Sequence, residues 1–198
     1  MGSRRLLHLT TLYETARELG GMSSPQEVME AFLLTAMGPV GAARGFVFTV
    51  NRFTRETRLA QRGLEPGETD ALGADLAGLI AACFPDHPEL GFGGEELSSL
   101  REFSAAPPPP LPPSTRILAA WTARGGQIGV LGLSGRLADA GLAPEDRDFL
   151  SALAGTLAEA LKNASAAESI RRLNLELASK NAELEEAVGQ ADAARGEL

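Results

Sequence analysis

Apolar residues recur along this chain at a few distinct spacings, and these spacings predict a series of helices and strands. Residues 4–19 and 24–38 carry apolar side chains every three or four positions, which is the pattern of amphipathic helices. Ser24 is placed to cap the second helix, and Gly38-Pro39 is placed to close it. The apolar positions of the first helix are Leu6, Leu9, Leu12, Tyr13, Ala16 and Leu19.

The middle of the chain alternates between short apolar runs and turn residues. Residues 45–50 are rich in aromatic and β-branched side chains and predict a strand, and residues 58–62 predict a weaker one. Residues 63–67 have the composition of a turn. Residues 74–84 predict a short apolar helix that ends before Pro85.

A hairpin follows later in the chain. Residues 117–123 and 128–133 are two apolar runs joined by Gly125-Gly126, and glycines permit the positive φ angles that a tight hairpin turn needs. The second run is apolar nearly throughout, which predicts a strand covered on both faces. Its glycines indicate close approach of another group to the backbone.

Residues 85–115 are dominated by proline and glycine and predict a long irregular segment. The proline-rich part, residues 105–113, has two interpretations. It could form a polyproline II ligand for a partner protein. It could instead be a stiff spacer in a variable loop.

The last third of the chain predicts one helix that runs unbroken from Pro144 to about Val188. Glu145 and Asp146 suit the positive N-terminal end of this helix. Its first part carries apolar residues at heptad spacing, as in the series Leu150, Leu157, Ala164. Its second part carries a thinner apolar stripe flanked by charges, made of Ile170, Leu173, Leu177, Leu184 and Val188.

The heptad phase changes between the two parts, because Ala164 and Ile170 are six residues apart. One interpretation is that the first part packs on its own domain and only the second forms a coiled coil. The other is that the phase break allows two packings of similar energy, which a ligand could bias. Either interpretation divides the chain into a domain at residues 4–164 and a coiled-coil helix at residues 165–198.

Together these elements predict an α+β domain in which helices flank an antiparallel sheet. The chain has 198 residues, 44% of them hydrophobic, and a net charge of -8. This charge disfavours binding of nucleic acid and docking on an anionic membrane. No apolar run is long enough for a membrane span, and the N-terminus lacks the apolar core of a signal peptide, so we expect a cytoplasmic protein.

Residues that could carry chemistry are few. One cysteine, Cys83, and two histidines, His8 and His87, cannot supply a cluster of metal ligands. We expect His8 to face solvent or a partner helix. No phosphate-binding loop or nucleophile elbow is present. We therefore expect no metal site and no enzymatic activity, and the sequence identifies no cofactor.

Three motifs near the end of the domain are a glycine-punctuated strand, an acidic helix start and an alanine-rich helix end. They read Ile128-Gly129-Val130-Leu131-Gly132-Leu133, then Ala143-Pro144-Glu145-Asp146-Arg147-Asp148-Phe149-Leu150, then Ala160-Leu161-Lys162-Asn163-Ala164. These motifs and the order of elements resemble those of GAF domains, small-molecule-binding relatives of PAS domains. The resemblance covers roughly residues 6–164 and implies a GAF-like sheet flanked by helices.

The resemblance also implies a ligand pocket between the sheet and the helix and loop that follow its second or third strand. In this chain that region would contain Arg62, Cys83, Phe92 and Trp121. Trp121 could form an aromatic wall of the pocket or pack in the core. The motifs by which GAF domains bind cyclic nucleotides or bilins, or reduce methionine sulfoxide, are incomplete here, so the ligand is not identified.

Residues 173–184 resemble the linkers that precede output domains in bacterial sensor histidine kinases. This resemblance implies the input module of a two-component system, which senses a small ligand or mediates dimerisation. An output domain or a partner kinase would read the state of the C-terminal helix. A ligand-free dimerisation scaffold is the alternative. The residues expected at a homodimer interface of terminal helices are Leu9, Leu153, Leu157, Leu161, Ile170, Leu173, Leu177 and Leu184.

Overall fold

A five-stranded antiparallel sheet lies at the centre of the fold, in a computed structural model that describes residues 2–51, 53–86, 98–123, 126–135 and 142–196. The strand order is β2-β1-β5-β4-β3. The strands are β1 (Gly45–Asn51), β2 (Thr57–Arg62), β3 (Ser98–Glu102), β4 (Thr115–Ala123) and β5 (Gln127–Ser134). The central strand β5 is buried at six consecutive positions, which confirms the prediction that both of its faces are covered.

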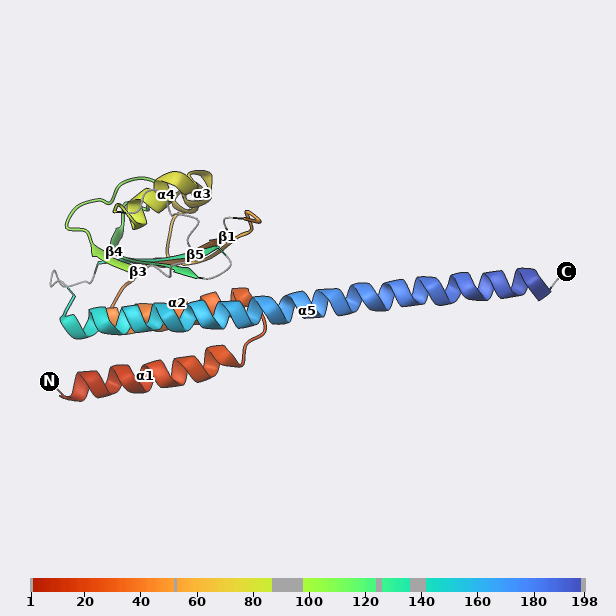
Figure 1. Cartoon of the computed structure of the whole chain (residues 1–198). Coiled ribbons are helices and arrows are strands. Elements are labelled where there is room, and N and C mark those ends of the chain that lie inside the picture. The colour runs from red at the N-terminus through yellow and green to blue at the C-terminus, as the bar shows by residue number, and fades with distance from the viewer. Residues whose placement is uncertain (1, 52, 87–97, 124–125, 136–141, 197–198) are drawn as a thin grey trace.

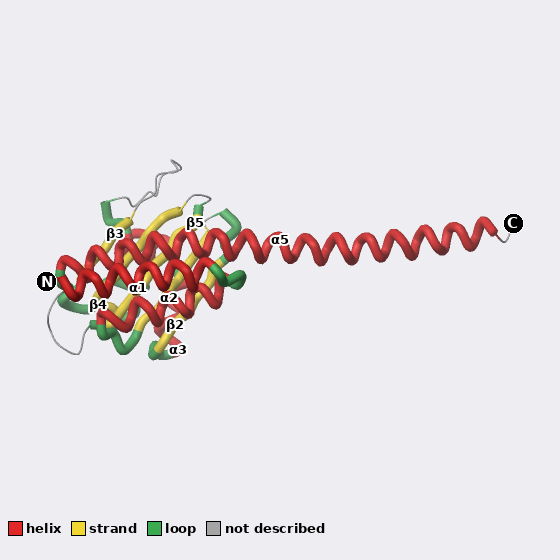
Figure 2. Tube along the Cα trace, turned by 90° about the horizontal axis from the view of Figure 1, so that it is seen from below, coloured by secondary structure: helices red, strands yellow, loops and turns green. Residues whose placement is uncertain are grey.

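Helices cover both faces of this sheet (Figure 1). One face carries α2 (Pro25–Val40) and the first part of α5 (Pro144–Gly196), and the other carries α3 (Pro66–Ala74) and α4 (Leu76–Cys83). The N-terminal helix α1 (Gly2–Gly20) lies outside the α2/α5 layer, so that α5 is sandwiched between α1 and the sheet (Figures 1 and 2). The predicted α+β class, a sheet flanked by helices with a long C-terminal helix, is confirmed.

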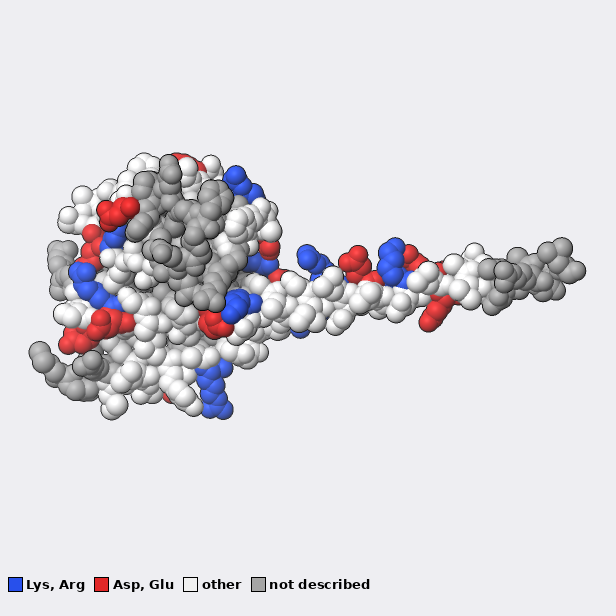
Figure 3. All heavy atoms as spheres, in the orientation of Figure 1, with Lys and Arg blue, Asp and Glu red and all other residues white. Residues whose placement is uncertain are grey.

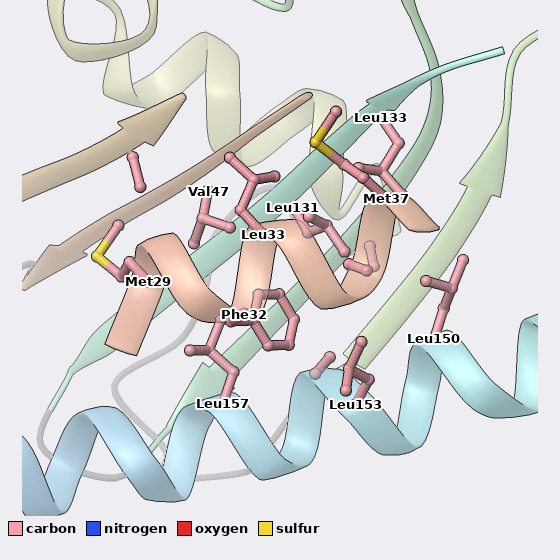
Figure 4. Close-up of a cluster of buried hydrophobic side chains, with 14 of the residues drawn as sticks. Met29, Phe32, Leu33, Met37, Val47, Leu131, Leu133, Leu150, Leu153 and Leu157 are labelled. Atoms are coloured by element: carbon pink, nitrogen blue, oxygen red, sulfur yellow. The ribbon is translucent and has the colours of Figure 1, made fainter. Parts of the chain in front are cut away.

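The alternation of side chains along the strands produces two separate cores. The larger core lies between the sheet and the α2/α5 layer, and Figure 4 shows α2 wedged between strand and α5 side chains there. Phe32 of α2 packs in this core with Leu131 of β5 and Leu157 of α5. The smaller core lies under α3 and α4 and contains Phe46, Phe48, Val130, Leu118, Leu79 and Cys83.

Two glycines of β5 make room for large aromatic side chains on the neighbouring strands. A Cβ atom at Gly129 would lie 2.0 Å from Cζ2 of Trp121, its partner in the β4–β5 register. A Cβ atom at Gly132 would lie 2.1 Å from Cε1 of Phe46, its partner in β1. The prediction that these glycines mark close approach to the backbone is therefore confirmed.

Two helical boundaries differ from the sequence prediction. Helix α2 continues through Gly38-Pro39 and ends at Val40, because Gly41 adopts φ 69° and its N–H donates to the carbonyl of Gly38. Helix α3 occupies part of the segment predicted as a turn. Pro66 stands at its first helical position, where the fixed φ of proline fits, so a residue read as a turn former begins a helix instead.

The segment predicted to be irregular, residues 85–115, contains strand β3. This strand is only five residues long, lies at a sheet edge and has no buried position, so its pattern is weak and the pairing with β4 forms it. The proline-rich part packs on the domain, with Pro107, Pro110, Leu111 and Pro112 buried. Pro108, Pro109 and Pro113 are exposed, so part of the run is accessible and part is packed. Residues 87–97 lie outside the described part of the chain.

Helix α5 is unbroken over 53 residues, which confirms the long helix predicted from Pro144. Among residues 144–190 of this helix Ala164 is the last buried one, and every residue from 168 to 190 is exposed. At about 1.5 Å per residue, the part beyond Ala164 projects roughly 50 Å from the domain, as Figure 1 shows. Among the described helices, none combines the length and apolar character that a membrane crossing requires.

Candidate functional site

The residues expected to line a GAF-type pocket do not come together. Cys83 is buried in the core under α3 and α4, whereas Trp121 is buried on the opposite face of the sheet, among residues of the α2/α5 core. Arg62 is exposed on the edge strand β2. Phe92 lies outside the described residues. The side chains of Trp121, Ile117 and Ala119 lie on the same face of the sheet, because residues two apart along a strand share a face.

Cys83 has the surroundings of a structural cysteine. Burial raises the pKa of its thiol from 9.0 to about 12, and the nearby Arg101 guanidinium lowers it only in part. The backbone around it is also fixed, since its carbonyl accepts a hydrogen bond of 2.7 Å from Ser99 Oγ. A thiol with so high a pKa is a poor nucleophile at neutral pH, so this residue offers no reactive group.

The most distinctive site in the described structure is the place where α5 leaves the domain. Leu150, Leu153, Leu157, Leu161 and Ala164 form the inner side of α5 and are all buried in the α2/α5 core. Leu173 follows Ala164 by about two and a half helical turns and therefore lies on the opposite, outer side. Leu177 and Leu184 lie close to the same outer side. The apolar stripe thus changes sides of the helix just beyond the domain.

This geometry divides the residues that the sequence assigned to a dimer interface. Leu153, Leu157 and Leu161 are covered by their own chain, so they leave no surface for a second copy, and their heptad spacing reflects core packing. Ile170, Leu173, Leu177 and Leu184 are exposed and available to a partner helix. Leu9 of α1 is exposed as well.

Helix α1 buries only part of its predicted apolar pattern against the domain. The buried positions are His8, Thr15 and Leu19, with Leu12 partly buried, and this set faces α5 and α2. The apolar residues on the outer side are exposed; they are Leu6, Leu7, Leu9 and Tyr13. The packed face is thus less apolar than the exposed one, and the exposed face includes Leu9, which the sequence assigned to the dimer interface.

The start of α5 is fixed by a polar cluster that the sequence did not predict. His8 is 5% exposed, its ring stacks on Phe149 with centroids 4.6 Å apart, and its Nε2 lies 3.7 Å from Oδ1 of the buried Asp146. Of the two expectations for His8, solvent is wrong, and the helix that it faces is α5 of its own chain. Glu102 of β3 accepts a hydrogen bond from the Leu142 N–H and pairs with Arg147. The spacing of His8 with Leu12, Thr15 and Leu19 is the sequence signal for its burial.

The end of the packed part of α5 is tied to the sheet by a second polar contact. Arg58 of β2 donates from Nη2 to Glu56 at 2.5 Å and to Glu168 of α5 at 2.7 Å. One turn further, Arg171 Nη2 donates to the hydroxyl of Ser23 at 3.3 Å. Both contacts lie just beyond Ala164, on the side of α5 that faces the domain.

The architecture is that of GAF domains. The structure is similar to the GAF domain of a protein assigned as a sensor histidine kinase from Pseudomonas syringae pv. tomato, with a TM-score of 0.53 and 19% identity over 85% of this chain and 94% of that chain. The GAF domain of a phosphoenolpyruvate-protein phosphotransferase from Coxiella burnetii also gives a TM-score of 0.53, at 18% identity over 84% and 99% of the two chains.

A third similar structure is the free methionine-R-sulfoxide reductase from Neisseria meningitidis in complex with its substrate, with a TM-score of 0.52 and 14% identity over 84% of this chain and 95% of that chain. No protein-family model and no curated protein matches the sequence. At these identities the structural similarity establishes the fold alone.

Proposed function

We propose that this chain is the input module of a signalling protein. In this proposal two copies pair in parallel through the outer sides of α1 and α5, and α5 carries the state of the domain to an output domain such as a histidine kinase. The observation that carries the proposal is the change of sides along α5. Its inner side is apolar and buried as far as Ala164, and an apolar stripe on its outer side begins at Ile170.

The exposed side of α1 supports a second copy of this chain as the partner. Leu6, Leu7, Leu9 and Tyr13 are each at least 60% exposed, and an exposed apolar patch of this kind is typical of an interaction surface. A shallow groove of about 190 Å³ lies beside it, between α1 and the start of α5. Because α1 lies against α5 on the side away from the sheet (Figure 1), the proposal assigns its patch and the outer stripe of α5 to the same partner.

The charges on the projecting part of α5 suit the flanks of a coiled coil. Figure 3 shows basic and acidic side chains interspersed along the helix beyond the domain. Lys180 pairs with Glu183 at 2.8 Å, one turn apart on the same helix. A narrow apolar seam with flanking charges of both signs is the pattern of a two-stranded coiled coil.

Sedimentation of the double variant Leu173→Glu/Leu177→Glu tests the dimer. Burying two carboxylates per chain in the seam opposes pairing, so we expect monomers with an intact domain. The matched control is Leu175→Glu, because Leu175 is also exposed but lies on the domain-facing side of α5. A double variant that sediments as a dimer, or a control that dissociates equally, would contradict the proposed seam.

Sensing in the strict sense requires a bound small molecule, whereas a dimerisation scaffold requires none. Native mass spectrometry and an absorbance spectrum of the freshly purified protein separate these functions. A bound mass or a chromophore band supports sensing, and a protein that carries neither and dimerises normally supports the scaffold.

A further inference from the structure

A polar groove of about 680 Å³ lies where α5 leaves the domain, on the side of the sheet that faces α2 and α5. Its volume is within the range of small-molecule sites, roughly 300–1,000 Å³. One wall is formed by the β1–β2 hairpin and the first residue of β5, and the other by α5 just beyond Ala164. The lining residues used here are Thr54, Arg58, Ser165, Glu168, Arg171 and Arg172.

Three arginines from two different elements line this groove. Arg58 projects from β2, and Arg171 and Arg172 come from α5. Guanidinium groups bind carboxylates and phosphates through paired N–H donors, so arginines on both sides of a groove favour an anion that spans it. The hydroxyls of Ser165 and Thr54 add donors that suit the same oxygen atoms.

Two carboxylates in the groove limit the kind of anion that fits. Glu56 and Glu168 both accept from Arg58, so a ligand that engages this arginine has to replace one of them. Glu168 can be replaced at low cost, because its side chain is 50% exposed and its pairing with Arg58 is a surface ion pair of the kind that contributes little to stability. A singly charged anion only substitutes for Glu168, whereas an anion with two or more charges also engages Arg171 and Arg172.

The charge of the whole chain narrows the range of possible ligands further. The net charge is -8, so a nucleic acid or an acidic protein surface is repelled at long range. A small anion is subject mainly to the local field of the groove, because screening by salt reduces the effect of distant charges. The groove is therefore better suited to a metabolite than to an anionic polymer.

We propose that this groove binds a small organic anion with two or more negative charges, a phosphate monoester or a polycarboxylate. Binding replaces the direct Arg58–Glu168 contact by a bridge from Arg58 through the anion to Arg171 and Arg172. The bridge joins the edge of the sheet to the first turns of the projecting helix. The site is formed within one chain and lies on the opposite face of the sheet from α3 and α4.

The test titrates the full chain with citrate and, separately, with inorganic phosphate, while amide chemical shifts are followed by NMR. We expect saturable shifts at groove residues such as Thr54 and Ser165. Tighter binding of citrate assigns the site to carboxylates, and tighter binding of phosphate assigns it to phosphate esters. Absence of saturable shifts with both probes, or shifts confined to α3 and α4, would overturn the proposal.

Two double variants sharpen this result. R171Q/R172Q is expected to weaken binding by about tenfold or more, because each lost guanidinium removes charge-assisted hydrogen bonds. R62Q/K180Q removes the same charge from exposed positions outside the groove and is expected to leave the affinity unchanged. Equal weakening by both pairs would reduce the effect to overall charge and refute the site.

E168Q tests the proposed competition between Glu168 and the anion for Arg58, because a variant that only lost its fold would not bind more tightly. Removing the carboxylate that competes for Arg58 is expected to tighten binding by about two- to fivefold, which is the range of a surface ion pair. Weaker binding by E168Q would contradict the exchange. The monomeric variant Leu173→Glu/Leu177→Glu is expected to keep the affinity, so a failure of the dimer proposal and a failure of this site are distinguishable.

Discussion

The two parts of α5 are predicted to respond in opposite ways to the same substitution. Leu153 and Leu173 are both leucines on one unbroken helix, but Leu153 is 0% exposed inside the α2/α5 core and Leu173 is 53% exposed. Leu153→Ala is therefore expected to destabilise the domain without changing the seam. Leu173→Ala is expected to weaken the dimer and leave the folding of the domain unchanged.

The magnitudes follow from burial. A buried Leu→Ala substitution costs about 2–5 kcal/mol, a large part of a total stability of about 5–15 kcal/mol, and lowers Tm by roughly 4–20 °C. An exposed substitution stays within about 0.5 kcal/mol. In a symmetric dimer the substitution removes Leu173 from both chains. Burial of each leucine contributes about 1.5 kcal/mol to dimerisation, so the loss of both raises the dimer Kd by at least about 100-fold.

Urea unfolding and sedimentation equilibrium measure the two effects separately. The single tryptophan, Trp121, is buried in the α2/α5 core and reports unfolding of the domain by its fluorescence. Unfolding is followed at several protein concentrations, because dimerisation adds stability by mass action. Equal losses of domain stability in the two variants at low protein concentration, or dissociation caused by Leu153→Ala alone, would refute this division of α5.

Two further predictions concern the cores on either side of the sheet. Gly129→Ala places a methyl group on the indole of Trp121 and is expected to lower the free energy of unfolding by about 1–3 kcal/mol. Adding Trp121→Leu in the same chain is expected to restore part of this loss, and the absence of any recovery would contradict the clash. Burial raises the pKa of the Cys83 thiol from 9.0 to about 12. As pH rises, the unfolded chain therefore loses this proton before the folded chain does. The stability that Cys83 contributes is complete below pH 9 and falls as pH rises towards 12. At pH 10, urea unfolding is expected to show that the free energy of unfolding has fallen by up to about 1.4 kcal/mol more than in Cys83→Ala. Parallel pH profiles of the two proteins would show instead that the thiol stays accessible to water.

The sequence predicted the elements whose patterns are strong and local. The long helix, the apolar strand β5 and the Ser24 cap each depend on residues close together in the chain, and all three are confirmed. Strand β3 could not be predicted, because five half-exposed residues become a strand only when β4 supplies hydrogen-bond partners. Helix α3 was hidden by Pro66, which is equally compatible with a turn and with a first helical position.

The candidate site was harder to predict than the fold, because its contacts join distant parts of the chain. Arg58 and Glu168 are 110 residues apart, and neither stands in a recognisable motif. His8 and Asp146 are also remote in sequence, and the most apolar face of α1 points away from the domain. Amphipathic patterns identify an apolar side of a helix, but they do not say whether its own chain or a partner covers that side.

The change of sides along α5 also explains the heptad phase break without a second packing. The inner series reaches Ala164, which is buried in the α2/α5 core, and the outer series begins at Ile170, where the helix is exposed. The helix between them contains no proline after Pro144 and stays continuous through Gly196. Any rotation or tilt of its inner side against the sheet must therefore move the outer stripe as well. In the proposed function, signal transfer requires only that a ligand change how α5 rests on the domain, and the Arg58–Glu168 contact joins these parts at the point where the helix becomes free.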